Sequence, residues 1–161
     1  MAISNIKNPS KWTLLATSNP SSVNNVSFTS ISNSYSKLLI AFEALYASTA
    51  DQLNVRLNND TGNNYSYSYV NYVGNLDSQG YASKILLGEV YTNTSPAGGY
   101  LLINGANDIY KTITYNKNSA QNYVAYKGEA NWHNSNEINR IDLFLNTHSL
   151  SATSVKLYGS N

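Results

Sequence analysis

The stretch "QLNVRLNNDTGNNYSYSYV", Gln52 to Val70, contains two alternating segments separated by a turn signal. Leu53, Val55 and Leu57 alternate with polar residues, and this period of two is typical of a half-buried β-strand. In the run NNDTGNN, Asn, Asp and Gly tolerate positive φ or bond to their own backbone. Tyr and Ser then alternate. The stretch therefore predicts a strand, a turn and a second strand.

The same pattern extends along the chain, where short apolar runs are separated by clusters of Asn, Ser, Gly and Pro. We expect about ten strands, and the clearest segments are 12–16, 24–30, 37–47, 52–58, 64–72, 83–91, 99–105, 110–115, 122–132, 137–146 and 153–158. A period of two nearly throughout predicts an all-β fold of two packed antiparallel sheets with little or no helix.

The run "KLLIAFEALYA", residues 37–47, is the only segment that resembles a helix. It is short, and it is better explained as a central strand covered on both faces. Glu43 lies inside this strand, and we expect a partner such as Arg56 on a neighbouring strand. Trp12 and Trp132 are expected to anchor the core.

Composition predicts one domain, residues 1–161, with residues 1–11 as a possible extended arm. Only 12% of the residues are charged, whereas Asn and Ser make up 47 of the 161 positions. The net charge of +1 and the 14 tyrosines argue against disorder. Ten scattered basic residues against nine acidic ones form no basic stripe, which argues against a nucleic-acid partner.

No cysteine is present, which excludes disulfides, thiol nucleophiles and cysteine-ligated zinc. The first residues lack the apolar stretch of a secretory signal, and no apolar run is long enough to span a bilayer. We therefore expect that the protein is synthesised in a cytoplasm and does not associate with membranes.

The turn after residue 57 has some features of a calcium loop, because Asn58, Asp60 and Gly62 are close in sequence. An EF-hand loop, however, needs Gly at position 6 and Glu at position 12. Counted from Asn58, Gly62 is at position 5 and Tyr69 at position 12. We therefore expect a turn stabilised by Asn and Asp side chains, with no metal and no cofactor.

The tyrosines at 65, 67, 69 and 72 have three explanations. They can belong to the core, form a subunit interface, or stack on sugar rings. Tyr65, Tyr67 and Tyr69 share one face of the predicted strand, since alternate residues point the same way.

Enzyme signatures are lacking. His133 and His148 are the only imidazoles and have no metal-ligand spacing, and no nucleophile elbow, P-loop or dinucleotide fingerprint occurs. The nine carboxylates have no spacing that selects a glycosidase pair. We expect no catalytic residues.

The motif Arg56, Asn58, Asp60, Gly62 and Tyr65, after the alternating Leu53 and Val55, resembles a pattern in small virion structural proteins of tailed bacteriophages. The opening "WTLL", the segment "YSKLLI" and the ending "SVKLYGSN" also resemble those proteins. Leu57 stands where an aromatic residue is expected. Within this motif we expect Arg56 and Asp60 to bond across the turn, with the tyrosines buried in the sandwich or a subunit interface.

The resemblance implies a β-sandwich of jelly-roll type that forms a homotrimer and performs no chemistry. It leads us to expect a capsid decoration, or cement, protein that contacts itself and other virion proteins such as the major capsid protein. The alternative is a tail-fibre or host-attachment module with weak carbohydrate binding. In either case the protein is expected in the virion, after synthesis in the cytoplasm of a bacterial host.

Overall fold

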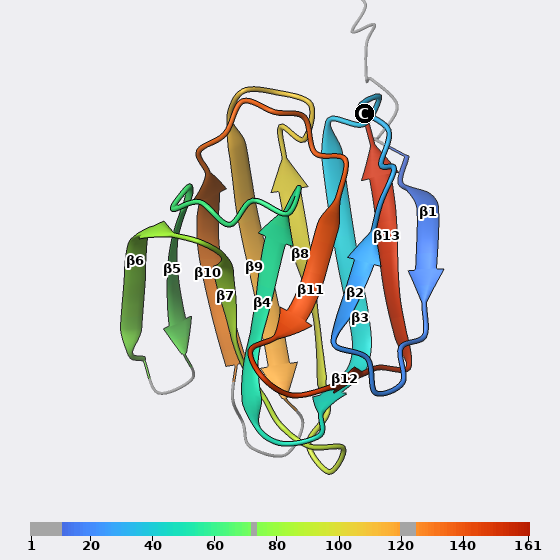
Figure 1. Ribbon diagram of the computed structural model, residues 1–161, viewed down its shortest axis with the longest axis vertical. Helices are drawn as coiled ribbons and strands as arrows, with labels where there is room; N and C mark the ends of the chain where they lie inside the picture. Colours follow the sequence, from blue (N-terminus) through green and yellow to red (C-terminus); the bar gives the residue numbers. More distant parts are fainter. Residues whose placement is uncertain (1–10, 72–73, 120–124) are drawn as a thin grey trace, which may run out of the picture.

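A computed structural model of the chain describes residues 11–71, 74–119 and 125–161, and this part contains thirteen β-strands and no helix (Figure 1). The strands pair in two antiparallel sheets, so the predicted antiparallel β-sandwich is confirmed. All eleven segments expected from the sequence overlap strands. The two missed strands are β6 (Leu76–Ala82), which is polar and exposed, and β12 (Leu150–Ser151), which has two residues.

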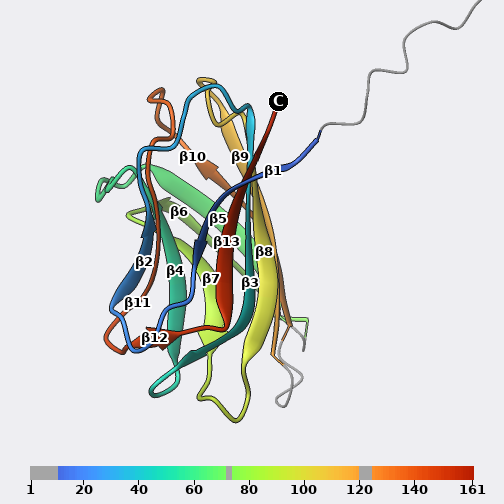
Figure 2. The ribbon, with the colours of Figure 1, turned by 90° about the vertical axis from the view of Figure 1, so that its right-hand side faces the viewer.

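The large sheet has the strand order β1-β13-β3-β8-β9-β10-β5-β6, and β12 pairs with β3 beside this path. Its strands are β1 (Thr13–Ser18), β13 (Ser154–Ser160), β3 (Lys37–Ala47), β8 (Ala97–Asn104), β9 (Lys111–Ser119), β10 (Ala125–Trp132), β5 (Tyr65–Asn71) and β6. The small sheet has the order β2-β11-β4-β7, with β2 (Asn25–Phe28), β11 (Ile141–Leu145), β4 (Asp51–Leu57) and β7 (Ile85–Val90). Figure 2 shows the two sheets as facing layers.

The core lies between the layers and follows the alternation seen in the sequence. Leu53, Val55 and Leu57 of β4 are all fully buried, as their alternation predicted. Trp132 is only 1% exposed and is a core anchor as expected, whereas Trp12 is 37% exposed, so its predicted core position is wrong. Trp12 precedes β1, a strand at the edge of the large sheet, where little of the protein can cover it.

Strand β3 differs from its prediction on one face. Leu38, Ile40 and Phe42 point into the core, but Leu39 and Ala41 point outward and are half-buried. No third layer lies outside the large sheet in the described ranges (Figure 2). The expectation that this strand is covered on both faces is therefore wrong for the single chain.

Candidate functional site

The turn between β4 and β5 is organised around the carboxylate of Asp60. Its Oδ2 accepts hydrogen bonds from Nε1 of the buried Trp132 at 2.7 Å and from Nδ2 of Asn64 at 2.9 Å, and its Oδ1 accepts from the backbone N–H of Gly62 at 2.9 Å. Nδ2 of Asn134 donates at 3.3 Å. Burial raises the pKa of the Asp60 carboxyl, but these four donors outweigh it and hold the pKa below its ordinary value.

The reversal itself uses the residue types that the sequence indicated. Asn58 and Asn59 have φ of 52° and 56°, and the backbone N–H of Asp60 donates to the carbonyl of Leu57, which is the geometry of a tight hairpin-type turn. The side chain of Asn58 also bonds outside the turn, donating to the carbonyl of Glu137 at 2.7 Å. The turn is thereby attached to the segment that connects β10 and β11.

Tyr65 connects this turn to the core. It is fully buried, its hydroxyl donates to the carbonyl of Leu57 at 3.1 Å, and it accepts from the N–H of the same residue at 3.0 Å. Its ring stacks on Trp132 with the centroids 6.3 Å apart. Asn58, Asp60, Gly62 and Tyr65 therefore lie together in one structural cluster.

Arg56 does not belong to that cluster, and the expected bond between Arg56 and Asp60 is wrong. The Arg56 guanidinium stacks over Phe144, with Cζ 4.7 Å from the ring centroid, and its buried Nε has no hydrogen-bond partner. The expected pairing with Glu43 is also absent, because the ion pairs of the described residues are Arg140–Asp142 and His148–Asp51. Arg56 and Phe144 lie on neighbouring strands of the small sheet, a pairing that the sequence did not indicate.

The tyrosines of β5 face inward. Tyr65 is buried, and Tyr67 and Tyr69 are half-buried against the core, with their rings stacked 6.4 Å apart. Tyr69 also meets Tyr126 edge to face at 5.5 Å, and its hydroxyl donates to Asp77 at 3.0 Å. This arrangement favours the core explanation for these three residues, and it leaves no exposed row of rings for a sugar. Tyr72 lies outside the described residues.

Part of the exposed apolar surface lies on the outer face of the large sheet. A row of directly opposite residues crosses four neighbouring strands: Leu14 of β1, Tyr158 of β13, Leu39 of β3 and Leu102 of β8. We call these four residues the outer row. Leu14 is 53% exposed, and the other three are half-buried. The adjacent row contains Lys156, Ala41 and Tyr100, and Tyr100 is 45% exposed.

A hollow of about 280 Å³ lies farther along the same face, over β5, β6, β8, β9 and β10. Tyr100, Val70 and Leu76 contribute apolar surface, and Lys127 and Glu129 contribute charged groups. Its lining therefore combines one exposed aromatic ring with polar side chains.

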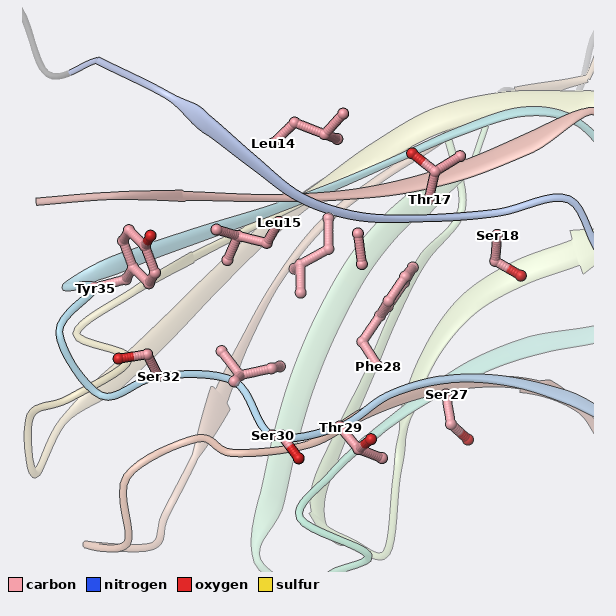
Figure 3. Close-up of a pocket in the computed structure, with 13 residues that line it drawn as sticks. Leu14, Leu15, Thr17, Ser18, Ser27, Phe28, Thr29, Ser30, Ser32 and Tyr35 are labelled. Atoms are coloured by element: carbon pink, nitrogen blue, oxygen red, sulfur yellow. The ribbon is translucent and has the colours of Figure 1, made fainter.

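A groove of about 690 Å³ separates the two sheets at the side where β1 and β2 form their edges (Figure 3). Leu15 and Phe28 point into the space between the strands, whereas Leu14 points away from it (Figure 3). Ile31, Leu157 and Ala16 complete the apolar lining, and the remaining lining residues are mainly Ser and Thr. None of the described residues that line the groove is charged.

In the described ranges, no group of three or more His, Cys, Asp and Glu side chains is arranged to hold a metal ion. The same part of the chain contains no helix that is long and apolar enough to cross a membrane. No protein-family model, no curated protein and no solved structure matches this chain.

Proposed function

We propose that this protein is a non-enzymatic structural component of a tailed-bacteriophage particle, made in the cytoplasm of the bacterial host and assembled into the virion. It works as a homotrimeric decoration protein on the head, bound to the major capsid protein, and a position in a tail fibre is the next choice. The proposal starts from the sequence motif and from the ending "SVKLYGSN", residues 154–161.

The observation that carries self-association is the uncovered face of β3. A continuous apolar strand is typical of a sheet that is covered on both sides. In the single chain, the outer side of β3 exposes part of Leu39 and Ala41, and the outer row continues this apolar surface over three neighbouring strands. A second copy packed on this face completes the burial that the strand composition indicates.

The strand order supports the jelly-roll part of the proposal. The chain passes from β2 in the small sheet to β3 in the large sheet and then back to β4 in the small sheet. It crosses again to β5 and β6 in the large sheet and returns to β7 in the small sheet. β8, β9 and β10 form a consecutive meander, and β11 returns to the small sheet between β2 and β4. Such repeated crossing between two sheets is typical of the jelly roll, an architecture found in viral capsid and lectin domains.

Placing a charge in the outer row is expected to break the self-association while the fold survives. Leu39→Lys and Leu102→Lys each put an ammonium group at an outward-facing position, so the monomer tolerates them. In the assembly the same charge is buried without a partner, at a cost of about 3 kcal/mol or more, and the dissociation constant rises about a hundredfold. Light scattering over a concentration series measures this change.

The matched control is Thr49→Lys, which adds the same charge at an exposed position between β3 and β4. It is expected to leave the oligomer intact. A wild-type protein that is a strict monomer and is absent from purified virions contradicts the proposed function. A trimer that binds purified capsids but not tails locates the protein on the head.

A second candidate function, host attachment through a glycan, is favoured by the hollow on the outer face. The ring of Tyr100 stands beside Lys127 and Glu129, and a sugar typically stacks on such a ring while polar groups bond to its hydroxyls. Tyr100→Ala is expected to weaken glycan-array binding about tenfold, because a stacked ring contributes on the order of 1–2 kcal/mol. Tyr110→Ala, at a 78% exposed ring outside the hollow, serves as the control. Equal binding by both variants contradicts this candidate.

A further inference from the structure

We propose that the groove between β1 and β2 receives residues 1–10 of a second copy of this chain as an added strand. The inference rests on the proposed self-association and extends it, because it names a second contact that is separate from the outer row. The groove lies at the open side of the sandwich, whereas three of the four outer-row residues lie outside its lining.

The backbone around the groove is suited to strand addition. In the described part of the chain, β1 pairs only with β13, and β2 pairs only with β11, so each strand has one free edge. Such edges present unpaired N–H and C=O groups, and an extended segment can bind them through main-chain hydrogen bonds. The two free edges border the same groove, which is about 690 Å³ in volume.

The lining matches the composition of the first ten residues. Leu15, Phe28 and Ile31 provide apolar contact, and the lining contains no charged side chain from the part of the chain that the structure describes. The segment "MAISNIKNPS" contains Ile3 and Ile6, no acidic residue and one basic residue, Lys7. A nearly neutral segment can enter such a groove without the high cost of burying several charges. Ten extended residues reach about 33 Å, which is enough to cross to a neighbouring copy.

Geometry favours the groove of a second copy over the chain's own groove. The segment leads directly into β1, which itself forms one wall of that groove. The turn signal in the segment is Asn8-Pro9. In an antiparallel hairpin that reverses there, Lys7 faces Ser10 and Ile3 faces Leu14. Only residues 1–3 then extend along the groove wall, whereas a segment from another copy can fill its whole length.

The absence of cysteine from the sequence allows a direct test by disulfide trapping. Ser4→Cys places a thiol in the segment, and Ser18→Cys or Ser32→Cys places one in the groove lining, near its two ends (Figure 3). Thr112→Cys, exposed on β9 and outside the groove, is the matched control. Each groove or control variant carries a size tag and is mixed with untagged Ser4→Cys protein under mild oxidation, so that a mixed dimer is identified by its mass on a non-reducing gel.

The mixed dimer with Ser18→Cys or Ser32→Cys is expected to exceed that with Thr112→Cys about tenfold or more, because docking raises the local thiol concentration. Two results overturn the inference. One is a mixed dimer no more abundant than the control. The other is an internal disulfide in monomers of the Ser4→Cys/Thr13→Cys double variant, because the hairpin register places Ser4 opposite Thr13. Light scattering of the same samples separates the two proposals: oligomers without the specific crosslink refute only the strand addition, and monomers refute the self-association itself.

Discussion

Replacing Asp60 by Ala is expected to lower the free energy of unfolding by about 3–5 kcal/mol, because the change removes a carboxylate that accepts four hydrogen bonds. The largest part of the loss arises at Trp132, whose indole N–H is left buried without an acceptor. Urea denaturation measures the effect. Asp60→Asn keeps an acceptor oxygen near Trp132. It is therefore expected to lower the free energy of unfolding by about half as much as Asp60→Ala does.

Asp77→Ala is the matched control for this prediction. Asp77 is exposed on β6 and accepts one hydrogen bond, from the hydroxyl of Tyr69. Its removal is expected to cost about 1 kcal/mol or less. If Asp60→Ala destabilises the protein no more than Asp77→Ala does, then the hydrogen bonds of the Asp60 carboxylate do not stabilise the fold.

Protonation of Asp60 is expected to lower the free energy of unfolding, as its replacement by Ala does. The pKa of this carboxyl is lowered in the folded protein, so its contribution is present above the ordinary value of 3.8 and is lost as the pH falls below it. Asp51 behaves likewise, since burial raises its pKa but hydrogen bonds from Thr147, Gln52 and His148 lower it to about 2. In the Asp60→Asn variant, the free energy of unfolding is therefore expected to fall less steeply as the pH drops below about 4. The fall that remains is due to Asp51.

Local patterns were enough to predict the fold class and most strands. The alternation of Leu53, Val55 and Leu57 predicted an inward face that is fully buried, and the Asn and Gly residues after Leu57 predicted the reversal. These features depend on neighbours in the sequence. The same locality explains why Asn58, Asp60 and Gly62 were assigned to a turn without knowledge of the segment to which they bond.

The features that sequence reasoning missed depend on residues far apart in the chain. Asp60 accepts a hydrogen bond from Trp132, which is 72 positions away in the sequence. Sequence proximity had suggested a bond to Arg56 instead. The outer row needs the register between β1, β13, β3 and β8, which come from both ends and the middle of the sequence. The sequence contained one signal of this outer surface. The apolar run of β3 indicated a strand covered on both faces, and the chain itself covers only one of them.

Lys117 was also missed, because a lysine in a polar run such as "YNKNS" ordinarily faces solvent. In the structure it follows Ile113 and Tyr115 on the inward face of β9 and is only 1% exposed. Its Nζ donates to the carbonyl of Glu89 and lies 4.7 Å from the ring centroid of Tyr126. Burial lowers the pKa of Lys117 to about 8, and the charge of Glu89 opposes this shift only partly.

The stability of the protein is therefore expected to rise between about pH 8 and pH 9. In this range the unfolded chain, with an ordinary lysine pKa of 10.5, binds a proton that the folded protein has released, so the free energy of unfolding increases with pH. The full shift corresponds to about 3 kcal/mol. Urea denaturation at pH 7, 8, 9 and 10 measures the rise.

Above about pH 9 the tyrosines are expected to reverse this trend. Burial raises the pKa of Tyr65 and Tyr115, and burial together with a neighbouring carboxylate raises the pKa of Tyr69 and Tyr91 to about 12. The unfolded chain loses these protons near pH 10 while the folded protein retains them, so stability falls. A maximum between about pH 9 and pH 10 is the expected result.

Lys117→Met separates the two limbs of this profile. It removes the titrating group but keeps a long side chain against Tyr126, so most of the rise between pH 8 and pH 9 disappears and the fall at higher pH remains. Burial also lowers the pKa of Lys84 and Lys111, and these two lysines keep a smaller part of the rise. At pH 7 the variant is expected to match or exceed the stability of the wild type, because it no longer buries an ammonium group. Lys127→Met, on the outer face of β10, serves as the control and keeps the rise. If Lys117→Met retains the full rise, then Lys117 does not titrate in the core, and another group causes the pH dependence.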